Sequence, residues 1–329
     1  MAILSKWLST PAAKYKAGLT GSIALLVLAM ALVYPEFADP ANAEVLVMNF
    51  ILEGFMALGM TAVIVTGGID LSVSAVVPFT AIITGLLLRA GSSIPVAIAA
   101  GLAAAAAVGA VNAGMRTAFR IHPFIATLAT MLSLKGLNLV ITRGAPLAGF
   151  PDAFAFFGRG RVLGVPFAIV LFAVLAVLAS VFLGRHRWGQ QLYLIGGNVR
   201  AARLSGVNVE RVLLLVYVLS STLAGVAGVI AASRYISAST GFGQNSELRV
   251  ITAVAIGGAS LNGGTGSIGG SILGVLFLAL VYHAFAMTGV STYWQDVVSG
   301  VMVLGAVLLA QLAGKRRSST TPAAVEPAP

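Results

Sequence analysis

The chain has 329 residues, 58% of them hydrophobic and only 9% charged, and its mean hydropathy is +0.98. A soluble domain carries about 25% charged residues, so the composition excludes a water-soluble fold and predicts a protein that lies in lipid. The net charge of +10 is then explained by basic cytoplasmic loops rather than by nucleic-acid binding. The absence of cysteine excludes disulfides and thiolate metal sites.

Apolar runs predict the fold class, an all-α polytopic membrane protein of about ten transmembrane helices, because each span needs about 20 apolar residues. A cleaved signal peptide is the alternative for the first run, since Ala41-Asn42-Ala43 resembles a cleavage site. The length of that run and the number that follow favour a span. The runs lie at about 18–34, 45–66, 72–88, 94–114, 123–141, 166–183, 212–232 and 248–261, with a ninth ending near 287 and a tenth at 294–312.

Three regions follow from this pattern. Residues 1–17 form a cytoplasmic N-terminal segment, and residues 18–312 form the transmembrane domain, with a cytoplasmic loop at 185–211. Residues 313–329, rich in Pro, Ala and Ser, form a disordered cytoplasmic tail. With both termini inside, the inner loops hold about twice as many Lys and Arg residues as the outer loops, which places the 185–211 loop in the cytoplasm.

Glycines interrupt the second run and allow close packing in the fourth. Gly67 and Gly68 break the helix, and Asp70 or Ser72 can cap the next one by accepting a backbone N–H. In the fourth run, small residues recur every four positions and allow a neighbouring helix to approach closely. They are Gly101, Ala105, Gly109 and Ala113.

A second glycine-rich segment, LNGGTGSIGG, follows the eighth run. Gly263 and Gly264 allow a broken or re-entrant helix, which is tolerated where the backbone lines a cavity or is buried in protein. Gly266, Gly270 and Gly274 form a GxxxGxxxG face for helix packing. The embedded GxGxxG pattern lacks the βαβ context and the downstream acid of a dinucleotide site, so the packing interpretation is favoured.

Intramembrane charges are expensive and usually face a cavity or a partner. Glu53 and Lys135 lie within predicted spans, and Asp296 lies at the start of the tenth. Glu53 and Lys135 are expected either to pair with each other or to line a polar path, and the remaining charges are assigned to loops. No HExxH or Walker A pattern occurs and the three histidines are scattered, so neither a metal site nor catalysis is predicted.

The segment GGNVRAARLSG predicts a helix of about two turns within the basic loop. Asn198 suits its N-cap, Gly206 suits a left-handed end, and Arg200 and Arg203 stand one turn apart. Such a helix is either a docking element for a partner or a loop helix resting on anionic lipid. The candidate coupling residues are Gly196, Gly197, Asn198, Arg200, Ala201, Ala202, Arg203, Leu204, Ser205 and Gly206.

At these residues the chain resembles the permease subunits of bacterial ABC sugar importers of the ribose type. Four segments carry the resemblance, at 59–75, 122–144, 195–209 and 253–274. The resemblance implies a multi-pass inner-membrane protein that pairs with a second permease, identical or homologous, with two cytosolic ATPases that bind ATP and Mg, and with a periplasmic sugar-binding protein. It implies no cofactor in this chain, and it makes 196–206 the coupling helix.

The implied mechanism is alternating access, with ATP hydrolysis in the partner chains. Three positions depart from the family pattern: Ser74 stands where Gly is common, Glu53 where an apolar residue is usual, and His122 where Ile or Val is frequent. A self-sufficient secondary carrier or channel for a small polar solute is the alternative function. The candidate path residues are Glu53, Thr61, Asn112, Thr130, Lys135, Asn138 and Asn262.

Overall fold

The computed structural model describes residues 11–291, 294, 297, 298, 300, 301, 304 and 305. Within this part of the chain the fold is an all-α membrane protein, and seven helices are long and apolar enough to cross a membrane. They are α2 (Pro11–Val33), α3 (Pro40–Val65), α5 (Ile94–Thr117), α6 (Pro123–Thr142), α8 (Phe167–Arg185), α11 (Val209–Tyr235) and α13 (Ile268–Met287). Most of the predicted tenth span, the first ten residues and the predicted tail lie outside the described residues.

Two further apolar helices are shorter. Helix α4 (Val73–Arg89) follows the break at Gly67, where φ is +70°. Helix α12 (Ser246–Ile256) has only 11 residues, about 17 Å of rise, whereas the hydrocarbon layer is about 30 Å thick. The apolar run at 248–261 is therefore helical only as far as Ile256: Gly257 and Gly258 follow, and Gly258 has a φ of +90° that ends the helix.

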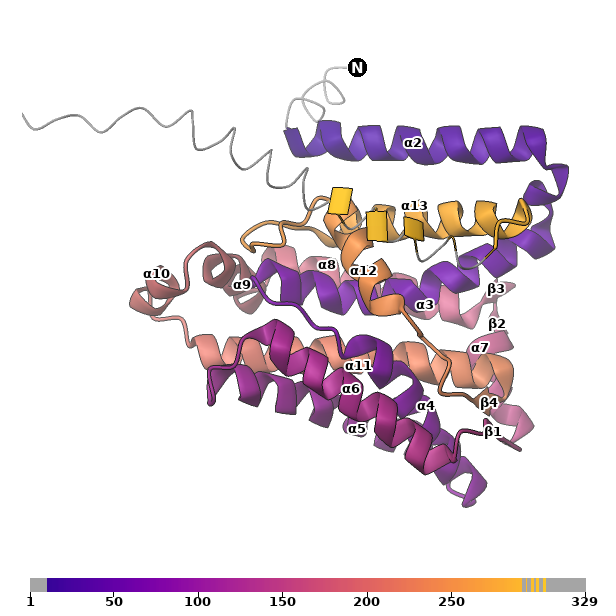
Figure 1. Ribbon diagram of the computed structural model, residues 1–329, viewed down its shortest axis with the longest axis horizontal. Coiled ribbons are helices and arrows are strands. Elements are labelled where there is room, and N and C mark those ends of the chain that lie inside the picture. Colours follow the sequence, from indigo (N-terminus) through magenta and orange to yellow (C-terminus); the bar gives the residue numbers. More distant parts are fainter. Residues whose placement is uncertain (1–10, 292–293, 295–296, 299, 302–303, 306–329) are drawn as a thin grey trace, which may run out of the picture.

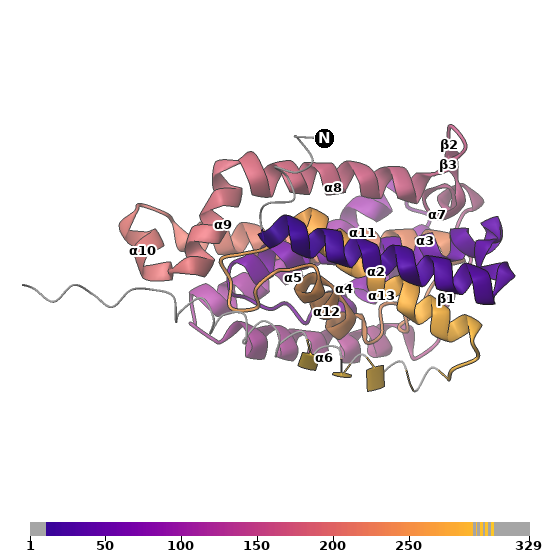
Figure 2. The same cartoon turned by 90° about the horizontal axis from the view of Figure 1, so that it is seen from above.

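The long helices run side by side, and the two ends of the bundle carry different elements (Figures 1 and 2). Helices α9 (Arg187–Gly197) and α10 (Val199–Leu204) project at one end, which is called the α10 end below. Small elements gather at the opposite end. They are η1 (Pro35–Ala38), η2 (Asp152–Ala155), α7 (Phe156–Arg159), β1 (Leu147–Ala148) paired antiparallel with β4 (Ser237–Ala238), and β2 (Arg161–Val162) paired antiparallel with β3 (Val165–Pro166).

Helix α11 forms the centre of the bundle and packs against α3, α4 and α5. Glycines bring these backbones together, because a side chain at any of them would meet the neighbouring main chain. Gly59 of α3 lies against Ser220, Gly109 of α5 against Tyr217, and Gly228 of α11 against Val77 of α4. The predicted small-residue face of the fourth run is buried in this contact.

Helix α2 lies at the edge of the bundle, where Ile23 and Met30 pack against Leu280 of α13. Its Tyr15 hydroxyl donates a hydrogen bond to the Ile256 carbonyl, 2.6 Å away, at the end of α12. The tripeptide at 41–43 lies in the first turns of α3. These contacts make α2 part of the packed structure.

The packing of α13 on α12 generates a prediction. Gly274 lies directly against the Ala253 carbonyl, so Gly274→Val is expected to force the two helices apart and to cost about 1–3 kcal/mol of stability. Gly269→Val is the matched control, since nothing lies within 4 Å of the position of its new Cβ. Melting temperatures in detergent check this: equal values for the two variants would show that the glycine contact is unimportant.

Candidate functional site

A buried carboxylate organises the break between α3 and α4. Asp70 is fully buried, and its Oδ1 accepts hydrogen bonds from the Ser72 amide at 3.1 Å and from the Ser72 hydroxyl at 2.6 Å. Its Oδ2 accepts one from the Ser220 hydroxyl of α11 at 2.9 Å. Asn112 of α5 donates to Ser72 Oγ, and Thr130 of α6 donates to Asn112 Oδ1. Asp70 therefore satisfies the exposed backbone just before α4 and links the break to three other helices.

Arg116 closes the same break from the α10 end. Its guanidinium donates to the Thr66 hydroxyl at 3.2 Å, to the Thr66 carbonyl at 3.3 Å and to the Tyr217 hydroxyl at 3.3 Å. A Cβ at Gly68 would collide with Arg116 Nη1 and the Tyr217 hydroxyl. The sequence therefore needs glycine at 68 so that the basic side chain can satisfy the end of α3.

Helix α12 carries two charges in its first turn, and each is paired with a different helix. Lys135 of α6 lies 3.5 Å from Glu247 Oε1, and Glu53 of α3 lies 3.0 Å from Arg249 Nε. The expected Glu53–Lys135 pair is therefore wrong, because α12 supplies a partner of opposite charge to each. Arg249, which was assigned to an outer loop, belongs to this helix.

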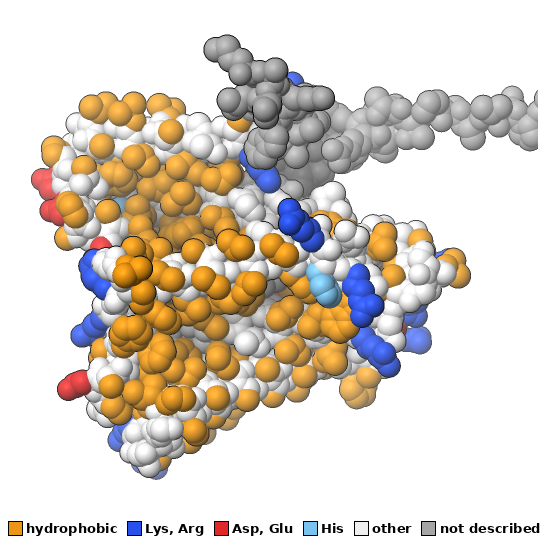
Figure 3. Space-filling model, turned by 180° about the vertical axis from the view of Figure 1, so that it is seen from behind, with side chains coloured by type: hydrophobic (Ala, Val, Ile, Leu, Met, Phe, Trp, Pro, Cys, Tyr) orange, Lys and Arg blue, Asp and Glu red, His pale blue; other side chains and the backbone are white. Residues whose placement is uncertain are grey.

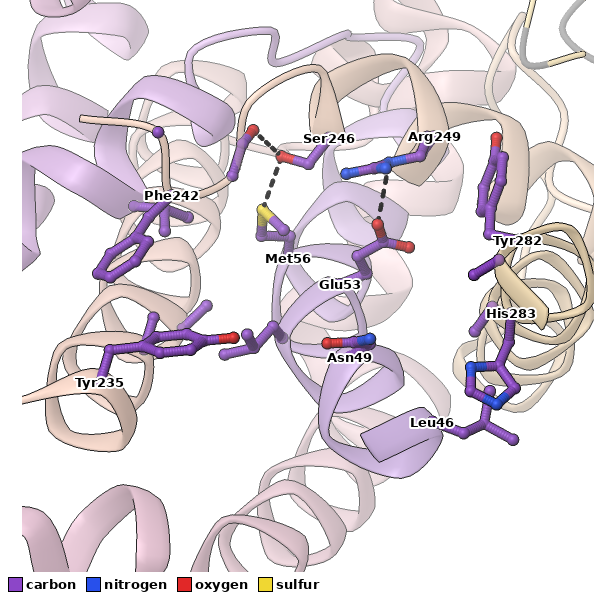
Figure 4. Close-up of a pocket in the computed structure, with 18 residues that line it drawn as sticks. Leu46, Asn49, Glu53, Met56, Tyr235, Phe242, Ser246, Arg249, Tyr282 and His283 are labelled. Carbon is purple, nitrogen blue, oxygen red and sulfur yellow. Dashed lines mark hydrogen bonds and ion pairs between the residues drawn. The ribbon is translucent and has the colours of Figure 1, made fainter. Parts of the chain in front are cut away.

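A cavity of about 390 Å³ lies between α3, α11, α12 and α13 (Figure 4). Its walls include the Glu53–Arg249 pair, Asn49, Tyr235 and Phe242. The lining comes from the N-terminal half of α3 and the C-terminal parts of α11 and α13. The cavity therefore occupies the half of the protein opposite the α10 end.

The other predicted path residues lie apart from this cavity. Thr61 is buried, and its hydroxyl donates to the Ala57 carbonyl and lies 2.7 Å from Ser271 Oγ, a contact that joins α3 to α13. Asn138 is buried and donates to the Ala75 carbonyl of α4. Asn112 and Thr130 belong to the Asp70 network, Lys135 pairs with Glu247, and Asn262 is exposed in the loop between α12 and α13. Of the seven candidates only Glu53 lines the cavity.

The α9–α10 segment has the predicted cap chemistry. Asn198 Oδ1 accepts hydrogen bonds from the backbone amides of Arg200 and Ala201, both at 3.0 Å, and Gly206 has a φ of +80°. Helix α10 has six residues, close to the predicted two turns. Arg203 forms an ion pair with Glu210, but both side chains are more than half exposed, so the pair adds little stability.

The outer surface of this segment mixes apolar and basic side chains. Leu204 is 86% exposed, and Leu194 and Val199 are also exposed, next to the exposed Arg200 and Arg203. Ser205 and Gly206 are exposed as well, while Ala202 is buried against the bundle. Ala202 therefore anchors α10, and Leu204 with the arginines faces outward. Single exposed leucines are ordinary, but here three apolar side chains share one projecting element.

Glycines join the α9–α10 segment to both helix breaks, and the contact is called the glycine junction below. A Cβ at Gly196 would meet the Val65 carbonyl and the Gly264 amide, and one at Gly263 would meet Gly67. The Gly264 amide donates to the Val65 carbonyl at 2.9 Å. Three backbones thus meet without intervening side chains: the end of α9, the end of α3 and the loop after α12. The neighbouring Gly197 has nothing within 4 Å of a Cβ.

Tyr193 strengthens the same contact. Its hydroxyl donates to the Gly266 carbonyl at 3.0 Å, and burial raises the pKa of Tyr193 above its usual value of 10.0. The hydroxyl therefore stays protonated and able to donate at neutral pH. Gly270 and Gly274 continue from this loop into the α12–α13 packing already described.

Sequence reasoning missed four charged or polar contributors: Arg116, Ser220, Glu247 and Arg249. Arg116 looks like an ordinary loop residue because it follows an apolar run, and Arg249, the second residue of the run at 248–261, looks like its edge. The helix begins at Ser246, before the predicted run, and this start places Glu247 and Arg249 in its first turn. No sequence pattern marks Ser220, because its hydrogen bond to Asp70 depends on how α11 packs against the break.

The sequence is similar to those of known transport proteins. The family model described as "Branched-chain amino acid transport system / permease component" matches residues 42–307. The chain is 40% identical to the Ribose import permease protein RbsC of Escherichia coli (strain K12) over 87% of this chain and 91% of the relative. It is 38% identical to RbsC of Bacillus subtilis (strain 168), over 87% and 89%. It is 33% identical to the L-arabinose ABC transporter permease protein AraH of Azospirillum brasilense, over 92% and 89%. No solved structure matches the chain.

The Asp70 network generates a prediction. Asp70→Leu removes the acceptor of two buried hydroxyls and one amide, so it is expected to lower stability by about 2–4 kcal/mol. Asp70→Asn keeps an acceptor oxygen in the same place and is expected to lose much less. Thermal unfolding in detergent measures both variants. A leucine variant as stable as the asparagine variant would show that these hydrogen bonds do not stabilise the break.

Proposed function

The chain belongs to the permease-component family of ABC transporters, and we propose that it imports ribose or a closely related sugar. Its named relatives import ribose or L-arabinose, which supports a pentose as the first solute to test. ATP hydrolysis and the binding of ATP and Mg belong to separate ATPase subunits. A second permease and a periplasmic sugar-binding protein complete the importer.

One observation carries the assignment of the coupling element. The α9–α10 segment projects from an apolar bundle, presents Leu204 between exposed arginines, and touches both helix breaks through the glycine junction. A partner that presses on this segment would therefore act on α3 and on the loop after α12 together. The candidate residues 196–206 form this contact with the ATPase.

Ten membrane crossings with both termini in the cytoplasm complete the proposal. The seven long helices supply seven crossings, and α4 and α12, each with the irregular segment before it, supply two more. The tenth is assigned to residues 294–312. Exposed arginines of the 185–211 loop lie at the α10 end, which supports a cytoplasmic location. Acidic side chains lie at the other end together with basic ones, beyond a broad apolar surface (Figure 3).

Reconstitution tests the proposed function. Proteoliposomes that contain the chain with its cognate ATPase are expected to accumulate D-ribose when ATP and the loaded binding protein are supplied. Omission of ATP, or of the ATPase, is expected to abolish accumulation. Ribose uptake by the chain alone would contradict the proposal and would favour a self-sufficient carrier or channel.

The coupling surface is tested by Leu204→Glu, which puts a charge into the apolar part of the docking face. We expect at least about a tenfold loss of ATPase co-purification, because the apolar contact of Leu204 is lost and a carboxylate must be desolvated in the interface. Leu163→Glu is the matched control: Leu163 is 99% exposed at the opposite end. Equal retention of the ATPase by both variants would show that α10 is not the docking site.

A further inference from the structure

The charges that line the cavity cancel one another. Glu53 and Arg249 form an ion pair on its wall, and the exposed fractions of the two side chains are 16% and 27%. The nearby His283 Nε2 is buried and has no hydrogen-bond partner among the described residues. A lining with one acid and one base favours neither an anion nor a cation. It offers carboxylate acceptors and guanidinium donors to a neutral polar molecule.

Aromatic rings form the opposite wall. Tyr235 of α11 and Phe242 lie with ring centroids 5.5 Å apart, across the cavity from Glu53 and Asn49 (Figure 4). Rings offer flat apolar surfaces to the C–H groups of a ligand, while the polar wall accepts and donates hydrogen bonds. A molecule with one apolar face and several hydroxyls matches both walls. The volume of about 390 Å³ is at the small end of the range for ligand sites.

We propose that this cavity is a binding site for a neutral monosaccharide within a single permease subunit, with Glu53, Arg249 and Asn49 contacting the hydroxyls and Tyr235 and Phe242 contacting the ring face. This site rests on the proposed function, the import of a sugar, and it gives each permease subunit its own sugar-binding site. The cavity lies in the half opposite the α10 end, where a sugar released by a binding protein enters. The wall supplied by α12 connects through the loop after it to the glycine junction.

The absence of cysteine allows a direct test, because a single introduced thiol is the only one in the chain. Ala286→Cys places it on the cavity wall without removing a proposed sugar contact. In spheroplasts that express the complete transporter, a membrane-impermeant methanethiosulfonate is expected to label this cysteine from outside. Millimolar D-ribose or L-arabinose is expected to slow the labelling at least about threefold.

Ala145→Cys is the matched control, since Ala145 is exposed at the same end and away from the cavity. Its labelling is expected to be fast and unaffected by sugar. Failure of the reagent to reach Ala286→Cys, or equal rates with and without sugar, would overturn the cavity proposal. If the same transporter still accumulates ribose with ATP, the proposed function stands and only the cavity assignment falls.

Charge exchange separates recognition from stability. The double variant Glu53→Arg/Arg249→Glu keeps an ion pair between α3 and α12, so the protein is expected to fold and to melt normally. If the sugar needs the carboxylate on α3 and the guanidinium on α12, the exchanged protein binds it more weakly. Half-maximal protection of Ala286→Cys from the thiol reagent is then expected to need about tenfold more sugar in the exchanged protein. Unchanged protection would show that the pair only joins the helices and would remove it from the proposed site. Loss of folding in the exchanged variant leaves the Ala286→Cys comparison in the wild-type background to decide.

Discussion

Within lipid, an interrupted helix leaves amides and carbonyls that no water can satisfy, and this constraint shapes the whole structure. In the part of the chain that the structure describes, helices are interrupted after α3 and after α12. At the first break a buried carboxylate and a guanidinium, from Asp70 and Arg116, take over the hydrogen bonds that the helix no longer makes. At the second, the loop donates to the Val65 carbonyl and lies against the first break. The two breaks are therefore satisfied partly by each other.

Much of this arrangement is legible in the sequence. Continuous apolar runs predicted the long helices, with ends within about seven residues of those observed, since length and composition alone determine whether a segment can span. Gly67 and the cap of α10 were also found, because glycine and asparagine report local backbone geometry. Hydropathy alone did not give the end of α12: the apolar run continues to 261, whereas the left-handed φ of Gly258 and the packing of Gly257 against Gly270 end the helix at Ile256.

The sequence could not show which of the intramembrane charges form ion pairs with one another. Glu53 and Lys135 were recognised as costly, yet their partners depend on where α12 begins and which way its first turn faces. Pairing is a property of three-dimensional placement, and four charges allow two neutral arrangements. The same limit applies to the predicted path. Thr61 and Asn138 have residue types that suit a polar lining, but their hydrogen bonds are used between helices.

The glycine junction determines how a displacement of α9 passes into the bundle. Side chains between two packed elements can change rotamer and absorb a small displacement, whereas main chain in direct contact cannot. Gly196 lies against Val65 and Gly264 with nothing to yield between them. A shift of α9 would therefore press on the end of α3 and on the loop before α13 together. The end of α3 and the loop before α13 therefore share one rigid point of contact with α9.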